Sequence, residues 1–153
     1  MVKGFVTKKS AQTKKLGQSF AKKLLKAKNI KKAVVLALEG ELGSGKTTFI
    51  QGFAKGLGIN QKILSPTFIL IKCYTLHATR CKNFYHVDCY RTKSPKELLD
   101  LGFRDIISHP QSIVAVEWAE RVKRILPKGA ARVKFKIISR NTRQIYVNIP
   151  KSI

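Results

Sequence analysis

One short stretch of the chain constrains its fold more than any other feature. Residues 40–47 read GELGSGKT and match the pattern G-x-x-x-x-G-K-[S/T] at every position. The continuous apolar run AVVLAL precedes it at 33–38, and a helical pattern follows it from about Lys46 to Leu57. A buried strand, a glycine-rich turn and a helix in this order predict a P-loop, in which backbone N–H groups and the helix N-terminus bind phosphate oxygens.

The P-loop predicts binding, but hydrolysis requires further groups. Lys46 is expected to reach the β and γ phosphates, and the hydroxyl of Thr47 to complete the oxygen ligands of Mg²⁺. A second metal ligand and a group that positions the attacking water are still needed. Two acids follow apolar strands: Glu117 ends SIVAVE and Asp88 ends FYHVD. The residues alone leave open which acid serves the metal and which the water, and either could instead pair with a surface lysine.

Apolar periodicity gives the rest of the architecture. A helix is expected from Ser10, a possible N-cap, and another near residue 94, where Ser94, Pro95 and Glu97 form a helix-start pattern. A short helix is expected at 119–126. Strands are expected at 33–38, 68–76, 84–90, 112–118, 131–139 and 143–149. The order predicts one α/β domain over residues 1–153, a three-layer P-loop NTPase sandwich with a parallel core and antiparallel additions.

Charge is the most unusual feature of the composition. Thirty-one Lys and Arg residues face eight Asp and Glu, for a formal net charge of +23. The lysines are spread along the whole sequence. They fit either a solvated basic surface or a nucleic-acid-binding surface, and both predict salt-sensitive association with RNA. The longest clean apolar run is far shorter than the roughly 20 residues of a membrane span. We therefore expect a soluble, cytoplasmic protein without a membrane partner.

Three cysteines are present, an odd number without C-x-x-C spacing. Cys73, Cys81 and Cys89 could be combined with His77 and His86 into a zinc site. The pattern of the segment that contains these residues instead predicts two strands and a turn. We therefore favour reduced thiols in a reducing compartment.

Beyond the P-loop, several segments resemble the TsaE family, formerly YjeE, over residues 10–147. The segments are LEGELGSGKTTFIQGFAKGLGI, LSPTFILIKCY, FYHVDCYRT, KELLDLGFRDII and VAVEWAERVKRILP. The Ser-Pro-Thr at 65–67, the His-x-Asp-x-Tyr-Arg at 86–91 and the Glu-Trp at 117–118 are hallmarks that ordinary P-loop kinases lack. Cys89, where the family usually has Leu, and the high positive charge are departures from the family pattern.

The resemblance implies a role for each matching residue. Thr47 and Glu117 would bind Mg²⁺, and Lys46 and Asp88 would be catalytic, Asp88 through the attacking water. The residues expected to contact the nucleotide are Leu42, Gly43, Ser44, Gly45, Lys46, Thr47, Thr48, Ser65, Thr67, Trp118, Ser10 and Arg143.

The resemblance also implies a function. TsaE proteins are small bacterial P-loop ATPases required for threonylcarbamoyladenosine modification of tRNA beside the anticodon. The chain would bind the TsaD–TsaB pair and use ATP hydrolysis to permit repeated turnover, with tRNA contacted through that complex or directly. Two alternatives remain. One is a small-molecule kinase, and the other is a nucleic-acid-binding module with a vestigial P-loop.

Overall fold

A single mixed sheet forms the centre of the molecule. The computed structural model describes residues 2–27, 31–65, 68–77 and 79–150. Its seven-stranded sheet has the order β1-β7-β6-β2-β5-β4-β3. The strands are β1 (Val2–Thr7), β2 (Val34–Glu39), β3 (Ile71–Thr75), β4 (Asn83–Asp88), β5 (Ser112–Glu117), β6 (Ala131–Ile137) and β7 (Arg143–Asn148). The helical segments are α1 (Ser10–Lys26), α2 (Lys46–Gly56), α3 (Lys96–Asp100), α4 (Phe103–Ser108) and the 3₁₀ segment η1 (Ala119–Ile125).

The direction of the strands follows the prediction. β6, β2, β5 and β4 run parallel to one another, whereas β3 pairs antiparallel with β4, and β1 and β7 extend the other side antiparallel. The α/β architecture with a parallel core and antiparallel additions is therefore confirmed. In the parallel core, Glu117 lies opposite Leu38 on one side and Asp88 on the other. The ends of β2, β4 and β5 thus meet at one edge of the sheet, where the P-loop begins.

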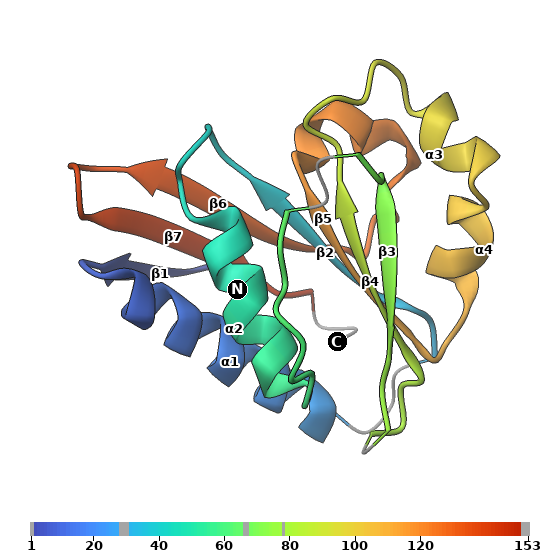
Figure 1. Cartoon of the computed structure of the whole chain (residues 1–153), viewed down its shortest axis with the longest axis horizontal. Helices are drawn as coiled ribbons and strands as arrows, with labels where there is room; N and C mark the ends of the chain where they lie inside the picture. Colours follow the sequence, from blue (N-terminus) through green and yellow to red (C-terminus); the bar gives the residue numbers. More distant parts are fainter. Residues whose placement is uncertain (1, 28–30, 66–67, 78, 151–153) are drawn as a thin grey trace.

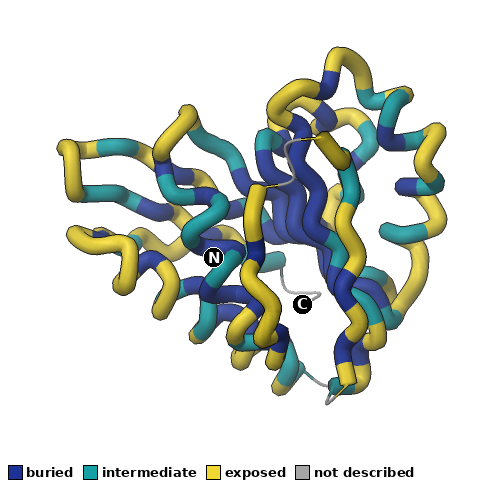
Figure 2. Tube along the Cα trace, in the orientation of Figure 1, coloured by how far each residue is buried: buried dark blue, intermediate teal, exposed yellow. Residues whose placement is uncertain are grey.

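Helices cover both faces of this sheet, as Figure 1 shows. Alternate residues of the central strands point to opposite faces, so Leu36 of β2 packs toward α1 and α2, while Val35 packs toward η1, α3 and α4. The two apolar clusters explain why the β2 and β5 sequences are continuously apolar. Figure 2 shows the result, with buried central strands and exposed outer helix surfaces.

Several local features differ from the sequence-based expectations. The N-terminal segment forms strand β1, which was not predicted and which pairs with β7 at the edge of the sheet. Ser10 is the first helical residue of α1 and not its cap: Lys9 occupies the N-cap position without a side-chain hydrogen bond. Instead, Gln12 Oε1 accepts the Lys8 N–H at 2.6 Å. At α3, Pro95 occupies the N-cap position and not the first helical position, and Glu97 Oε1 accepts the Ser94 N–H at 3.1 Å.

One global property concerns membranes. None of the helices in the described part of the chain is long and apolar enough to cross a bilayer.

Candidate functional site

The P-loop owes its shape to glycines with left-handed backbone angles. Gly45 adopts a φ of 100° at the N-cap of α2, and Gly40 adopts a φ of 147° where β2 ends. A Cβ atom on Gly40 would lie only 2.8 Å from the carbonyl oxygen of Phe135. The turn is therefore both strained for other residues and closely packed against β6. It directs the loop to the N-terminus of an eleven-residue helix, a favourable position for an anion.

Lys46 folds back onto the loop that precedes it. Its Nζ atom donates to the carbonyl oxygens of Gly40 at 2.6 Å and Glu41 at 2.9 Å. The ammonium group also lies 4.0 Å from the ring centroid of Trp118. Burial lowers the pKa of Lys46, and the nearby carboxylates, Glu117 first among them, oppose this shift. A phosphate group would supply the negative charge that a buried ammonium requires.

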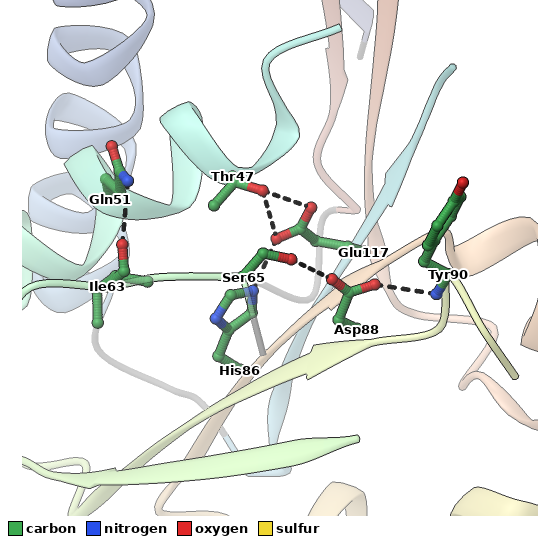
Figure 3. Close-up of polar contacts among 8 residues, drawn as sticks. All are labelled: Thr47, Gln51, Ile63, Ser65, His86, Asp88, Tyr90 and Glu117. Carbon is green, nitrogen blue, oxygen red and sulfur yellow. Dashed lines mark hydrogen bonds and ion pairs between the residues drawn. The ribbon is translucent and has the colours of Figure 1, made fainter. Parts of the chain in front are cut away.

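Thr47 and Glu117 meet at the mouth of the loop, as Figure 3 shows. Thr47 Oγ1 lies 3.0 Å and 2.9 Å from the two carboxylate oxygens of Glu117 and donates to them. His86 Nε2 lies 2.8 Å from Glu117 Oε1 and donates, because a carboxylate oxygen can only accept. Glu117 and His86 are 2% and 0% exposed. The carboxylate is thus fixed by two side chains from different elements.

Asp88 is held separately from Glu117, although the two residues are neighbours in the sheet. Its Oδ1 accepts the backbone N–H of Tyr90 at 2.9 Å, and its Oδ2 accepts a hydrogen bond from the Ser65 hydroxyl (Figure 3). The Cys89 N–H donates to the backbone oxygen of Glu117 at 3.1 Å, which ties the end of β4 to the end of β5. Two carboxylates with different partners therefore face the same loop.

These residues surround one cavity of about 620 Å³. The predicted site residues that line it are Leu42, Gly43, Ser44, Gly45, Lys46, Thr47, Thr48, Ser65, Asp88, Glu117 and Trp118. Thr67 lies outside the described residues, so its predicted role stays a prediction.

Two residues predicted to contact the nucleotide, Arg143 and Ser10, are not among those that line the cavity. Arg143 donates to the carbonyl oxygen of Gly43, at 3.3 Å from Nε and 3.1 Å from Nη2. Ser10 is exposed at the start of α1, and the methyl group of Thr13, on the same helix, is 3.7 Å from a Cβ built on Gly45. Arg143 supports the loop directly, whereas Ser10 makes no described hydrogen bond to it.

Sequence reasoning predicted Trp118 at the site but missed the aromatic and basic side chains around it. Tyr90 packs against Trp118 with ring centroids 5.0 Å apart, and Arg121 lies over both rings, at 5.8 Å and 5.6 Å. Phe68, 91% exposed, lies 5.7 Å from the guanidinium of Arg91. Tyr90 and Arg91 belong to the His-x-Asp-x-Tyr-Arg motif, so their place in that motif was the available signal.

The role of His86 was also missed. Its position two residues before Asp88 on the same strand was the clue, because residues i and i+2 of a strand point to one face. All three cysteines are free, Cys73 being exposed and Cys81 and Cys89 buried. Within the described ranges, no group of three or more His, Cys, Asp or Glu side chains could hold a metal ion.

Comparisons with known proteins agree on one family. The family model for the "Threonylcarbamoyl adenosine biosynthesis protein TsaE" matches residues 7–145. The chain is 38% identical over 132 residues to the tRNA threonylcarbamoyladenosine biosynthesis protein TsaE of Rickettsia prowazekii, covering 86% of this chain and 87% of the relative. The TsaE protein of Bacillus subtilis is 42% identical over 111 residues, with 72% and 66% covered. The crystal structure of Bacillus subtilis YdiB is 31% identical and superimposes with a TM-score of 0.68, covering 96% of this chain and 84% of that one.

Proposed function

The chain belongs to the TsaE family of threonylcarbamoyl adenosine biosynthesis proteins, and on this premise we propose that it is a Mg²⁺-dependent ATPase serving tRNA modification. The TsaD–TsaB transferase pair is its proposed partner, and ATP hydrolysis its means of returning that pair to a state ready for another transfer. The contact between Thr47 and Glu117 at the mouth of the P-loop is the observation that carries this proposal.

In this proposal the loop binds the triphosphate through its main chain. The N–H groups of residues 43–47 and the N-terminus of α2 provide the donors, and Lys46 provides the mobile positive charge. Lys46 exchanges the carbonyl oxygens of Gly40 and Glu41 for phosphate oxygens. Because those carbonyls are neutral acceptors, an anionic partner is the stronger one for a buried ammonium.

Thr47 and Glu117 are the proposed Mg²⁺ ligands. A hydroxyl oxygen and a carboxylate within 3.0 Å of each other form the hard oxygen pair that this ion prefers. His86, by donating to Glu117 Oε1, holds the carboxylate in orientation. When bound, Mg²⁺ supplies positive charge against the phosphate oxygens.

Asp88 is proposed to orient the attacking water. Its two oxygens already accept from the Ser65 hydroxyl and the Tyr90 N–H, and each carboxylate oxygen has a further lone pair for a water proton. Ser65 connects this carboxylate to the segment that follows α2. A change at the terminal phosphate can therefore be transmitted to that segment and from there to a partner protein.

The decisive experiment measures ATP hydrolysis and tRNA modification together, with TsaD and TsaB present. The wild-type chain is expected to support many modification cycles per transferase pair, and Lys46→Ala about one. Normal repeated turnover with Lys46→Ala would contradict the proposal. Omission of Mg²⁺ should abolish hydrolysis by the wild-type chain, which separates a metal-dependent ATPase from a protein that only binds nucleotide.

A further inference from the structure

The acidic residues of this chain are confined to one part of the molecule. Residues 1–38 and 42–87 contain no Asp or Glu, although lysines are frequent in both segments. These segments include α1 and α2, the two helices that cover one face of the sheet (Figure 1). The eight acids are Glu39, Glu41, Asp88, Glu97, Asp100, Asp105, Glu117 and Glu120. They lie at the ends of the central strands, in the P-loop (Glu41) and in the opposite helical layer, so α1 and α2 themselves carry only positive charge.

Ion pairing does not neutralise this layer. Among the described residues, the ion pairs connect Arg132 and Lys134 to Glu39, Lys96 to Asp100 and His86 to Glu117. None of these involves a lysine of α1 or α2. The lysines of α1 and Lys55 of α2 are exposed, and their charges therefore add up to a positive potential over this layer.

Close packing of the two helices gathers some of these lysines around a hollow. A Cβ atom on Gly52 would lie 1.9 Å from the carbonyl oxygen of Lys14, and one on Gly17 would lie 2.2 Å from that of Phe49. Only glycine permits this approach. The crossing helices and the loop after α2 border a hollow of about 650 Å³, whose lining includes Lys14, Lys15, Gln18, Lys55, Asn60 and Lys62.

The loop that carries Lys62 is hydrogen-bonded to α2. Gln51 Nε2 donates to the carbonyl oxygen of Ile63 at 3.0 Å, a contact visible in Figure 3. Ile63 is itself buried in the core cluster. The hollow therefore has a fixed wall on the side of Lys62, and binding there requires little ordering of the backbone.

The positive charge continues beyond the hollow. Lys15, Lys22 and Lys26 are separated by seven and four residues, so they form one stripe along α1, roughly 16 Å long at 1.5 Å per residue. A single small anion cannot contact the whole stripe. We name the hollow and the stripe together the α1–α2 face, consisting of Lys14, Lys15, Gln18, Lys22, Lys26, Lys55, Asn60 and Lys62.

We infer that the α1–α2 face binds the phosphate backbone of double-stranded RNA, such as an arm of a tRNA. Extended charge favours a polyanion, and the Gln18 and Asn60 amides add donors and acceptors for phosphate and ribose hydroxyls. A duplex is favoured over a single strand, because the aromatic Phe20, Phe49 and Phe53 of these helices are buried and offer no stacking platform.

The same face fits a membrane poorly. Helices that lie on bilayers present large apolar side chains to the lipid. Within the described ranges, the large exposed hydrophobic residues lie outside α1 and α2, at Val2, Val6, Leu42, Leu64, Phe68, Ile69, Tyr90, Leu101, Ile138 and Tyr146. The apolar side of α1 packs on α2 and the sheet instead.

A salt titration of RNA binding tests this inference. Labelled tRNA transcript and a short RNA hairpin are titrated with the full chain between about 50 and 200 mM salt. The hollow variant changes Lys14, Lys15, Lys55 and Lys62 to Gln. The matched control removes four exposed charges from the opposite layer, by changing Arg104, Lys123, Arg124 and Lys128 to Gln. A third variant replaces the four lysines of the hollow with Arg.

The expected result is specific to the hollow. Each lost phosphate contact lowers the slope of log K against log salt by about 0.9, so the hollow variant should lose about three to four in slope and bind at least tenfold more weakly. The control should lose less than about one in slope. The Arg variant should bind like the wild-type chain, because Arg also contacts phosphate.

Four results would overturn the inference. The first is an equal loss of RNA affinity and salt slope in the hollow variant and the control, and the second is no hairpin binding at the lowest salt. The third is tighter binding of oligouridine than of the hairpin. The fourth is binding of phosphatidylserine vesicles or polyglutamate as tight as that of the hairpin. The inference does not rest on ATP hydrolysis. RNA binding should survive in Lys46→Ala, and nucleotide binding should survive in the hollow variant.

Discussion

Asp88 and Glu117 are opposite residues on the neighbouring parallel strands β4 and β5, yet their carboxylates have separate partners. Glu117 accepts hydrogen bonds from Thr47 and His86, whereas Asp88 accepts from Ser65 and the Tyr90 N–H. The two acids, whose roles the residue pattern alone left open, therefore have different surroundings, which agrees with the different roles proposed for them. The first is held against the P-loop threonine, and the second against the segment after α2.

The first prediction concerns the metal site. Glu117→Gln keeps the size of the side chain but removes its negative charge, so we expect Mg²⁺-dependent ATP hydrolysis to fall about 10²-fold or more. Thr47→Val should behave similarly, whereas Thr47→Ser, which retains the hydroxyl, should remain active. Hydrolysis rates measured against Mg²⁺ concentration check this. An unchanged Mg²⁺ dependence in Glu117→Gln would remove this residue from the metal site.

The second prediction separates Asp88 from Glu117. Asp88→Asn should lower kcat for ATP hydrolysis by about 10²- to 10⁴-fold, because a carboxylate that orients the attacking water is lost. Its affinity for ATP and Mg²⁺ should stay close to that of the wild-type chain. Steady-state kinetics and direct nucleotide titration give the two quantities. A weakened Mg²⁺ affinity with normal kcat would instead assign Asp88 to the metal.

The third prediction uses the single tryptophan of the chain. The ring centroid of Trp118 lies 4.0 Å from Lys46 Nζ, so the proposed movement of this ammonium toward a phosphate would change the environment of the indole. ATP binding should therefore alter the intrinsic fluorescence of the wild-type chain. Lys46→Ala should show a different starting intensity and little further change at the same ATP concentration. Fluorescence that does not respond to saturating ATP in the wild-type chain would contradict the proposed movement.

The fourth prediction concerns His86 as a positioning residue. Replacement by Ala removes the donor to Glu117 Oε1 from a buried site, and we expect a loss of about 1.5–3 kcal/mol in the free energy of unfolding. The Mg²⁺ concentration for half-maximal hydrolysis should rise as well. His86→Gln, whose amide can donate to the same oxygen, should recover part of the Mg²⁺ affinity. Denaturant unfolding and Mg²⁺ titration distinguish this role from a purely structural one, which would leave the Mg²⁺ affinity unchanged.

The fifth prediction concerns pH and the buried thiol of Cys89. Burial raises its pKa from 9.0 to about 12. The folded protein therefore favours the neutral thiol. The contribution of the buried Cys89 thiol to the free energy of unfolding is complete below pH 9 and is lost as the pH rises through about 12. The reason is that the thiol ionises at lower pH in the unfolded chain than in the folded one. The wild-type chain should lose more stability than Cys89→Ala between pH 8 and pH 11 in denaturant unfolding. Parallel pH profiles would contradict this.

Local patterns in the sequence predicted much of the fold. The apolar runs of β2 and β5, the glycines of the loop and the helix from Lys46 gave the P-loop and its neighbouring strand ends. β1 escaped prediction because its VKGFVT sequence is mostly exposed, and the strand forms through pairing with β7. Ser10 failed as a cap because α1 begins one residue earlier in the chain than a cap at that position requires.

The sequence by itself determined the glycine-rich P-loop and the presence of an acid at the end of each of two apolar strands, because these follow from short-range patterns of glycine and hydrophobic residues. Tertiary structure alone decided the partners of those acids. The contact between Thr47 and Glu117 spans seventy residues of sequence and depends on the order of strands in the sheet. Tertiary structure also decided where the lysines gather, since the close crossing of α1 and α2 brings lysines from both helices around one hollow only when the chain is folded.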